Sequence, residues 1–461
     1  MNVDTFRLSF LMVLAFVAPL SAAPQIDTVT FQQGVGGYSG SFDRKISPTG
    51  SVDANGADVD TDSASYFLDG GSSALNDDGA RHGLLRFSDI VGPGAIPAGA
   101  KIIGATVDLV TNNSNDSQSG ASYNLYRLNT AFDSDSTWAD PFGGDGTIGD
   151  VGEILGSFDR PAQGQPISAR ADRAVQSWVD GAANLGFGIR SDRSTDGWSP
   201  NTTGASTVAN RPQLTVNYTL NPLVEITGYQ NGVNGYSGTN DLRLDSGGSD
   251  VVGSTTEQVF LDGYDPDAPS PDQSYLIRFD DINLNYREIY RAELVLVSGF
   301  SSGNADSPGP FSVHQMLDDW STSTTYADID ANGDTSVSDL TELQAAGTIA
   351  PAAATLTGMN DTEVVHVDVT SIVENWRAGQ TNYGFFIGTP TLADGGTANG
   401  WQIFVTGASD ASFRPELRII GVLVPEPSTM TTLLGAALLG AFGVPRISRR
   451  RNGRPWRFSL C

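Results

Sequence analysis

The sequence VQSWVDGAANLGFGI (residues 175–189) recurs as VENWRAGQTNYGFFI at residues 373–387, 198 positions later. Further matches occur in the same order: VGGYSG (35–40) with VNGYSG (233–238), FLDG (67–70) with FLDG (260–263), LLRFSDI (84–90) with LIRFDDI (276–282), and TGAS (203–206) with TGAS (406–409). Matches in a fixed order along the whole chain indicate a tandem duplication. The two copies cover residues 24–220 and 221–423, and their joint lies near Asn221 and Pro222.

Within each copy, apolar residues alternate with polar or small residues along short runs. Examples are IGATVDLVT (103–111) and YNLYRLN (123–129) in the first copy, and RAELVLVSG (291–299) and FSVHQML (311–317) in the second. A period of two predicts strands that bury one face, and the Asp-, Gly-, Ser- and Asn-rich stretches between them predict turns. Only residues 171–179 and 369–377 have a short helical pattern. The sequence therefore predicts an all-β protein with two antiparallel β-sandwiches in tandem.

The charge and the residue types exclude several classes of function. A net charge of −27 argues against a nucleic-acid partner, because a phosphate backbone requires a basic surface. The single cysteine, Cys461, cannot form an intrachain disulfide. None of the three histidines has a counterpart in the other copy, and no nucleophile elbow, metalloprotease helix or phosphate loop is present. We therefore expect no enzyme activity and no organic cofactor.

Both ends of the chain differ in composition from the body. An apolar run at residues 8–20 follows Arg7 and precedes small residues at 21–23, which predicts a secretory signal peptide at residues 1–23. Near the other end, a Pro-Glu-Pro turn at residues 424–429 precedes an apolar segment at 430–447 and an arginine-rich tail at 448–461. The apolar segment is close to the shortest length that spans a bilayer. The arginines predict a cytoplasmic tail and a body outside the membrane.

This carboxyl-terminal arrangement resembles the PEP-CTERM sorting signal of bacteria. The matching box consists of Val424, Pro425, Glu426, Pro427 and Ser428, and the transmembrane segment and arginine cluster follow it in the family's order. The resemblance implies an exosortase-type sorting enzyme as a partner. It also implies anchoring in the inner membrane before processing, and then a place in the cell envelope or extracellular matrix. The ten residues after Arg451 form a longer tail than is usual in that family.

The repeated body resembles the DNRLRE domain family, whose jelly-roll-like modules are related to carbohydrate-binding modules. The matching positions in the first copy are Arg86, Phe87, Trp178, Gly181, Asn184, Gly186, Phe187, Arg211 and Pro212. Those in the second copy are Arg278, Phe279, Trp376, Gly379, Asn382, Gly384, Phe385, Arg414 and Pro415. The second copy has Tyr326 where the first has the family's usual tryptophan, Trp138. The resemblance implies jelly-roll-like sandwiches on a bacterial surface or extracellular protein.

The sharpest metal-ligand pattern is DIDANGDTSVSD at residues 328–339. Its candidate ligands, at positions 1, 3, 5, 7 and 12 of an EF-hand-like loop, are Asp328, Asp330, Asn332, Asp334 and Asp339, and Gly333 stands at the turn position. Alternating carboxylates on a tight loop suit Ca²⁺. Three features oppose the match: Thr335 replaces an apolar residue, the last ligand is Asp rather than Glu, and no helical pattern precedes the loop. A Ca²⁺ loop and an ordinary acidic surface loop both remain open.

Two aromatic pairs occupy equivalent places in the copies, and they are candidates for stacking on sugar rings. These pairs are Trp198 with Trp401, and Tyr38 with Tyr236. The alternative is that the rings close the ends of the sandwich cores. Together with the two ends of the chain, these residues predict an exported surface or matrix protein whose modules bind or organise polysaccharide. A structural surface protein without glycan affinity and a polysaccharide-degrading enzyme are the alternatives.

Overall fold

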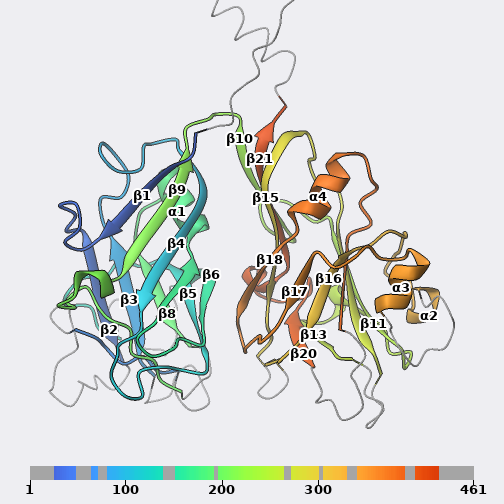
Figure 1. The fold of residues 1–461 in the computed structure, drawn as a ribbon, viewed down its shortest axis with the longest axis horizontal. Coiled ribbons are helices and arrows are strands. Elements are labelled where there is room, and N and C mark those ends of the chain that lie inside the picture. Colours follow the sequence, from blue (N-terminus) through green and yellow to red (C-terminus); the bar gives the residue numbers. More distant parts are fainter. Residues whose placement is uncertain are drawn as a thin grey trace, which may run out of the picture.

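The computed structural model describes residues 25–47, 64–70, 80–138, 151–191, 196–263, 271–300, 305–329, 340–389 and 400–424. The predicted signal peptide, the transmembrane segment and the arginine-rich tail lie outside these ranges. Within the described ranges, no helix is long and apolar enough to cross a membrane. Figure 1 shows two β-rich bodies side by side, one formed by each copy, and we call them the first and second modules.

The first module consists of two antiparallel sheets. One sheet has the strand order β1 (Asp27–Gln32), β9 (Gln213–Thr219), β4 (Lys101–Val110) and β7 (Pro166–Arg170). The other has the order β2 (Ser41–Ile46), β3 (His82–Phe87), β8 (Phe187–Arg190), β5 (Ser122–Leu128) and β6 (Val151–Asp159). Helix α1 (Asp172–Val179) and the 3₁₀ turn η1 (Val208–Asn210) complete the module.

The second module repeats this order with additional elements. Its first sheet contains β10 (Val224–Gln230), β21 (Glu416–Leu423), β15 (Tyr286–Val297) and β18 (Val364–Asp368). Its second contains β12 (Val251–Val252), β11 (Thr239–Asp245), β14 (Gln273–Phe279), β19 (Phe385–Gly388), β16 (Phe311–Gln315) and β17 (Ala354–Leu356). Strands β13 (Gln258–Leu261) and β20 (Trp401–Phe404) form a separate pair. The helices are α2 (Tyr326–Ile329), α3 (Leu340–Ala346) and α4 (Thr370–Arg377), and the 3₁₀ turns are η2 (Gly253–Thr255) and η3 (Ala411–Phe413).

Each module has its own hydrophobic core between its two sheets. In β4 of the first module, buried Ala105, Val107 and Leu109 alternate with the partly exposed Thr106 and Asp108. They pack with residues of the opposite sheet in a cluster that runs from Phe31 to Val216, and the second module has its own cluster from Tyr229 to Ile419. The predicted all-β architecture with antiparallel sheets and sandwich-like packing is confirmed, because period-two patterns bury one face of each strand.

Several residues of the repeated motifs hold these sandwiches together. Trp178 of α1 packs on Phe187 with ring centroids 5.0 Å apart, and Trp376 of α4 packs on Phe385 at 5.1 Å. A buried ring on each short helix therefore ties it to the sheet beneath. The amide group of Asn184 donates to the Phe87 carbonyl oxygen at 2.7 Å, and its counterpart in the second module makes the equivalent bond. The repeated sequence therefore records how each module folds.

Candidate functional site

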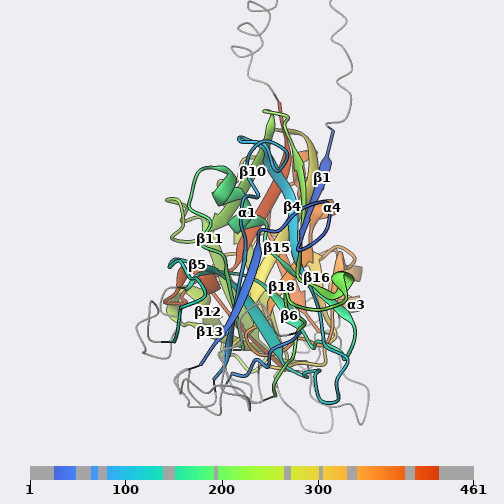
Figure 2. The same cartoon turned by 90° about the vertical axis from the view of Figure 1, so that its left-hand side faces the viewer.

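The two modules contact each other along an apolar strip that we call the seam. Tyr126 of β5 and Ile154 of β6 pack with Val295, Val297 and Phe404 of the second module in one buried cluster. Strand β6 lies against β18, and Figure 2 shows the molecule turned so that the first module faces the viewer. The outer face of a sheet in the second module is thus covered by the first module. Burial of this apolar surface favours a fixed arrangement of the two modules.

Buried charges surround the apolar strip. Asp172 at the start of α1 is 2% exposed and forms an ion pair with Arg418 of β21. Arg170 of β7 donates to both carboxylate oxygens of Glu293, at 2.8 and 3.1 Å, and to Asp172 at 3.1 Å. Burial alone would raise the pKa of Asp172, but Arg418, Arg170 and Arg291 together hold it well below its usual range. Each module thus supplies the counter-charges that the other requires.

Arg173, the second residue of α1, forms another part of the ionic network. Arg173 donates to Glu416 of β21 at 2.7 Å and lies 3.7 Å from Glu153 of β6. Burial would lower the pKa of Arg173, but Glu416 and Glu153 raise it above its ordinary value. His366 of β18 has a pKa lowered to about 3 by its burial, so it is neutral at physiological pH. The seam therefore combines charged pairs with a neutral imidazole.

A polar contact zone closes one end of the seam. The amide group of Asn124 donates to the carbonyl and hydroxyl oxygens of Thr362, both at 3.1 Å. Arg160 of the first module donates from Nε and Nη2 to Asn360 Oδ1 at 3.0 and 2.7 Å. The Ser157 hydroxyl accepts a bond from the Val364 amide at 2.8 Å. These bonds join residues that are 200 or more positions apart in the chain, so they fix the loop before β18 against the first module.

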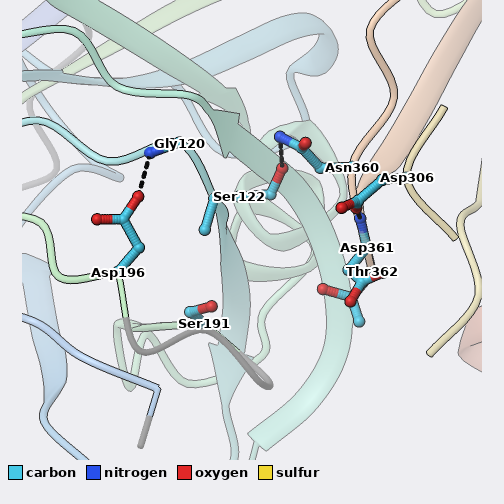
Figure 3. A pocket seen from close by; sticks show the side chains of 9 residues that line it. Gly120, Ser122, Ser191, Asp196, Asp306, Asn360, Asp361 and Thr362 are labelled. Atoms are coloured by element: carbon cyan, nitrogen blue, oxygen red, sulfur yellow. Dashed lines mark hydrogen bonds between the residues drawn. The ribbon is translucent and has the colours of Figure 1, made fainter. Parts of the chain in front are cut away.

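A cleft of about 370 Å³ opens beside this zone, and both modules line it. Figure 3 shows the lining residues, which are Gly120, Ala121, Ser122, Ser191 and Asp196 from the first module and Asp306, Asn360, Asp361 and Thr362 from the second. All of these side chains are small, and most carry a hydroxyl, amide or carboxylate group. Such groups can exchange hydrogen bonds with the hydroxyls of a sugar.

Hydrogen bonds fix the walls of the cleft on both sides. The Gly120 amide donates to Asp196 Oδ2 at 2.5 Å within the first module, and the Asp361 amide donates to Asp306 Oδ1 at 2.7 Å within the second. Across the seam, the Asn360 amide group donates to Ser122 Oγ at 3.2 Å. The cleft therefore has a preformed shape that depends on how the two modules are joined.

Two carboxyl groups behind the cleft have perturbed protonation. Burial raises the pKa of Glu363 to about 8, and the nearby Asp159 adds to the effect. Burial also raises the pKa of Asp159 above its ordinary value. The Glu363 carboxyl group accepts a hydrogen bond from the backbone N–H of Asn360 at 2.8 Å, so Glu363 supports the loop that carries the cleft residues. It does not line the cleft itself.

The tryptophan pair predicted to bind sugar is part of the cores. Trp198 and Trp401 are both 0% exposed, and their indole N–H groups donate to Thr111 at 3.0 Å and Ser298 at 2.9 Å. A fully buried ring has no free face on which a sugar could stack, so the stacking prediction for Trp198 and Trp401 is wrong. Their alternative interpretation, as rings that close the sandwich cores, is correct.

The tyrosine pair is partly exposed, and each ring braces a loop. The hydroxyl groups of Tyr38 and Tyr236 donate to the backbone oxygens of Ser88 and Asp280, each at 2.9 Å. Burial raises the pKa of both hydroxyls well above the ordinary value. Neither ring lines the cleft at the seam. A glycan contact at Tyr38 or Tyr236 stays a prediction.

Of the predicted calcium ligands, only Asp328 belongs to the described residues. Its carboxylate accepts bonds from the Thr325 backbone N–H and hydroxyl, both at 2.8 Å, and Asp328 is the third residue of the short helix α2. Asp330, Asn332, Asp334 and Asp339 lie outside the described ranges. The one-turn helix α2 begins two residues before the loop and includes its first two residues, and helix α3 begins directly after the loop. Among the described residues, no group of three or more His, Cys, Asp or Glu side chains is arranged to hold a metal ion.

The sorting box is described only at its first residue. The Val424 amide donates to the Asn285 carbonyl oxygen at 3.1 Å directly after β21 ends. Pro425, Glu426, Pro427 and Ser428 lie outside the described ranges. The prediction of a sorting signal therefore stays a prediction.

The cleft and the ionic network were not predicted from the sequence. Except for Ser122 at the start of β5, the cleft residues lie outside the helices and strands, where the sequence has no periodic pattern. A signal for the seam does exist in the differences between the copies. Glu293 and Arg418 are paired on β15 and β21, where the first module has Thr106 and Thr215 paired on β4 and β9. Charged residues on an outer face of one copy alone indicate that this face has a partner.

Comparisons with known proteins give no assignment. No family model and no curated protein matches the chain. A solved mutant VP2 protein of infectious bursal disease virus, in derived T=1 particles, is 8% identical over 89% of this chain and 79% of that chain, with a TM-score of 0.14. Another structure of particles derived from that virus is 10% identical over 87% and 74% of the two chains, with a TM-score of 0.15. TM-scores this low carry no information about fold or function here.

Proposed function

We propose that this chain is an exported bacterial cell-surface or extracellular-matrix protein whose paired modules bind polysaccharide in the cleft at the seam. The observation that carries the proposal is the cleft itself, which both modules line with small hydroxyl, amide and carboxylate side chains. Its volume of about 370 Å³ suits one or two sugar units of a longer chain. Its preformed walls reduce the entropy lost on binding.

The strand order supports a jelly-roll-like assignment for each module. Strands β1, β9, β4 and β7 form one sheet, and β2, β3, β8, β5 and β6 form the other, so neighbours in a sheet are mostly distant in sequence. This is the connectivity expected for nested Greek keys. It agrees with the resemblance to modules related to carbohydrate-binding domains. We include this assignment in the proposal because such modules present ligand sites on loops and sheet faces.

The ends of the chain support export and sorting. The signal-like residues 1–23 and the box at 424–429 suit a protein that an exosortase-type enzyme processes at the inner membrane. To test this, the box residues Pro425, Glu426 and Pro427 are replaced by alanine in a host that has the sorting system. We expect the variant to stay in the membrane fraction while the parent protein reaches the envelope or medium. Equal distribution of both proteins would remove this part of the proposal.

Two alternatives compete with glycan binding. A structural surface protein would use the buried seam only for rigidity. A polysaccharide-degrading enzyme is favoured by one observation, the raised pKa of Glu363, because a carboxyl group protonated near neutral pH can act as a general acid. Its place behind the cleft weighs against that role. If the parent protein releases oligosaccharides and Glu363→Gln does not, the enzyme alternative would be supported.

A blocked cleft tests the binding proposal. Ala121 lines the cleft and is partly exposed, so Ala121→Trp should fill the cleft without disturbing a core. We expect at least a tenfold loss of affinity for the bound polysaccharide, measured on a glycan array and then by calorimetry, since the bulky ring excludes the ligand. Ala131→Trp, at an exposed position beyond the far end of β5 from Ser122, is the matched control. Equal binding by the parent protein and Ala121→Trp would exclude this cleft as the site.

A further inference from the structure

A second pocket lies at the seam on the outer face of the first module's sheet. It has a volume of about 120 Å³, and its walls include Gly104 and Thr106 of β4, Asn217 of β9, Arg170 of β7 and Arg291 of β15. The Arg291 guanidinium from the second module lies beside Gly104 of β4, with Nη1 3.6 Å from where a Cβ would stand. The pocket therefore exists only because the two modules are joined.

Arg291 is the least satisfied charge in this part of the seam. Its Nε and Nη2 atoms are buried, and they form no hydrogen bond within the described residues. Nε lies 3.4 Å from Glu293 and Nη2 lies 3.7 Å from Asp172, and both distances are longer than good charged hydrogen bonds. Both carboxylates already accept shorter bonds from Arg170. The Nη1 group lies beside Gly104 of the pocket wall and has no hydrogen-bond partner within the described residues, so it is the donor that Arg291 offers to a ligand in the pocket.

The ion-paired groups at the seam carry an excess of positive charge. Five guanidinium groups meet four carboxylates there: Arg127, Arg170, Arg173, Arg291 and Arg418 with Glu153, Asp172, Glu293 and Glu416. Asp108, further along β4, is a fifth carboxylate near this face, and it accepts bonds from Ser168 and from Thr215 of the pocket wall. Among the residues that line the pocket itself, the charged ones are Arg170 and Arg291, so the wall is cationic and suits an anion.

The remaining polar groups of the pocket are suited to the same ligand. Asn217 Oδ1 accepts a bond from Thr28 at 2.7 Å, which leaves its amide N–H groups as donors. The Thr106 hydroxyl is a further donor, and within the described residues it has no hydrogen-bond partner. Guanidinium, amide and hydroxyl donors that converge on a small volume favour an oxyanion over a neutral or cationic group.

We propose that this pocket binds a small oxyanion group, a carboxylate or sulfate, with the Arg291 guanidinium as its main partner and Thr106 and Asn217 as further donors. The volume of about 120 Å³ admits the charged group but not a whole sugar ring. The group can be a free ion or the acidic substituent of an extracellular polysaccharide. The pocket is separate from the cleft lined by Asn360 and Asp361.

Protonation of Arg291 agrees with this assignment. Burial lowers the pKa of its guanidinium, and Arg170 and Arg418 add to the effect, while Glu293 and Asp172 oppose it. The charged form is therefore under-compensated in the folded protein. A bound anion would supply the missing counter-charge at a site where solvent screens it only in part.

The test measures anion binding to the full-length protein by isothermal titration calorimetry at constant low ionic strength. The probes are sulfate, galacturonate, trigalacturonate and, as the neutral control, galactose. We expect saturable binding of sulfate and galacturonate, and a loss of about tenfold or more in affinity in Arg291→Gln, because a charged hydrogen-bonding partner is removed. Thr106→Val keeps the shape of the side chain and should lower affinity several-fold without lowering Tm.

The matched control is Arg287→Gln, which removes the same charge from an exposed position of the same strand. Equal losses of anion affinity in Arg287→Gln and Arg291→Gln would show only general electrostatic attraction and would overturn the proposal, as would the absence of saturable anion binding.

Trigalacturonate that binds more tightly than galacturonate would identify an acidic polysaccharide as the source of the anion, and equal affinities would identify a free anion. The cleft-blocking variant Ala121→Trp should leave anion binding unchanged, so the two sites can fail independently.

Discussion

Glu363 links the protonation of one buried carboxyl group to the stability of the seam. Its pKa is raised from 4.5 to about 8 in the folded protein, so the folded state holds a proton that the unfolded state releases. Stability from this group is complete below pH 4.5 and falls as the pH rises toward 8. Glu363→Gln should remove this fall. We expect the variant to be more stable than the parent at pH 8.5, on the order of a few kcal/mol.

Urea unfolding between pH 5 and pH 9 measures this effect. Glu257→Gln, at an exposed position, should follow the parent protein across the whole range. His366 affects stability in the acidic range instead. Its pKa is lowered from 6.5 to about 3 in the folded protein, so its contribution to the free energy of unfolding is lost as the pH falls below 6.5. Parallel pH curves for Glu363→Gln and the parent protein between pH 5 and pH 8 would contradict the assigned protonation of Glu363.

At the scale of elements, helices α2 and α3 lie at the two ends of the candidate calcium loop. Tyr326 of α2 and Leu340 and Leu343 of α3 are buried in one small core, so the bases of the loop are anchored. We expect Ca²⁺ to raise Tm, because a ligand that binds only the folded state stabilises it, by about 2.7 kcal/mol at 100 times its Kd. Combined Asp330→Ala and Asp334→Ala should abolish the shift, measured by calorimetry with and without a chelator.

A charge-matched pair of substitutions serves as the control for the calcium loop. Glu288→Ala with Glu257→Ala also removes two negative charges, at exposed positions outside the core that joins α2 and α3. This double variant should keep the full calcium shift. If the Ca²⁺-induced increase in Tm is reduced equally in both double variants, Ca²⁺ acts only by screening the negative charge of the surface. The loop would then be an ordinary surface loop.

Strands and the helices α1 and α4 could be predicted because their signals are local, whereas α2 and α3 were not predicted. The run that contains Ala105, Val107 and Leu109 buries alternate residues, and no other part of the chain is needed to see this. The environment of Trp198 could not be predicted, because an aromatic residue beside glycine is compatible with a core or a ligand site. Only the fold shows that Leu68 pairs with it across an isolated bridge and that its ring is covered.

The seam and its pockets depend on which faces of the modules meet, and no local pattern encodes that choice. Asn124 and Thr362 are 238 positions apart and become partners only through the complete fold. The sequence therefore predicted two modules but not their common cleft. The one local indication of the seam was that Glu293 and Arg418 on β15 and β21 replace the uncharged Thr106 and Thr215 of the first module.

At the scale of the whole molecule, the buried ionic network should make the two modules unfold together. Asp172→Asn leaves Arg418, Arg170 and Arg291 without a shared counter-ion. Removing one partner of a buried ionic network costs about 3–5 kcal/mol. We expect a single calorimetric transition for the parent protein. The variant should show a lower Tm and two separable transitions, because the modules keep their own cores.

Arg287→Gln should keep a single transition with an unchanged midpoint, since its side chain is exposed. Two transitions in the parent protein would show that the modules are thermodynamically independent. In that case the seam would not couple them, and the shared cleft would lose its preformed shape. The single-transition result would make the double module the functional unit.

The position of β21 determines how the molecule responds to mechanical force. This strand lies between β10 and β15 and ends one residue before Val424, where the predicted tether begins. Residues Glu416 to Val422 of β21 pair with β10, and residues Glu416 to Leu423 pair with β15. Ladder bonds lie perpendicular to the strands, so a pull along the tether loads them in shear, all at once. When fluid drag pulls on a molecule tethered to a surface, the force therefore acts in the direction in which the sheet resists unfolding most.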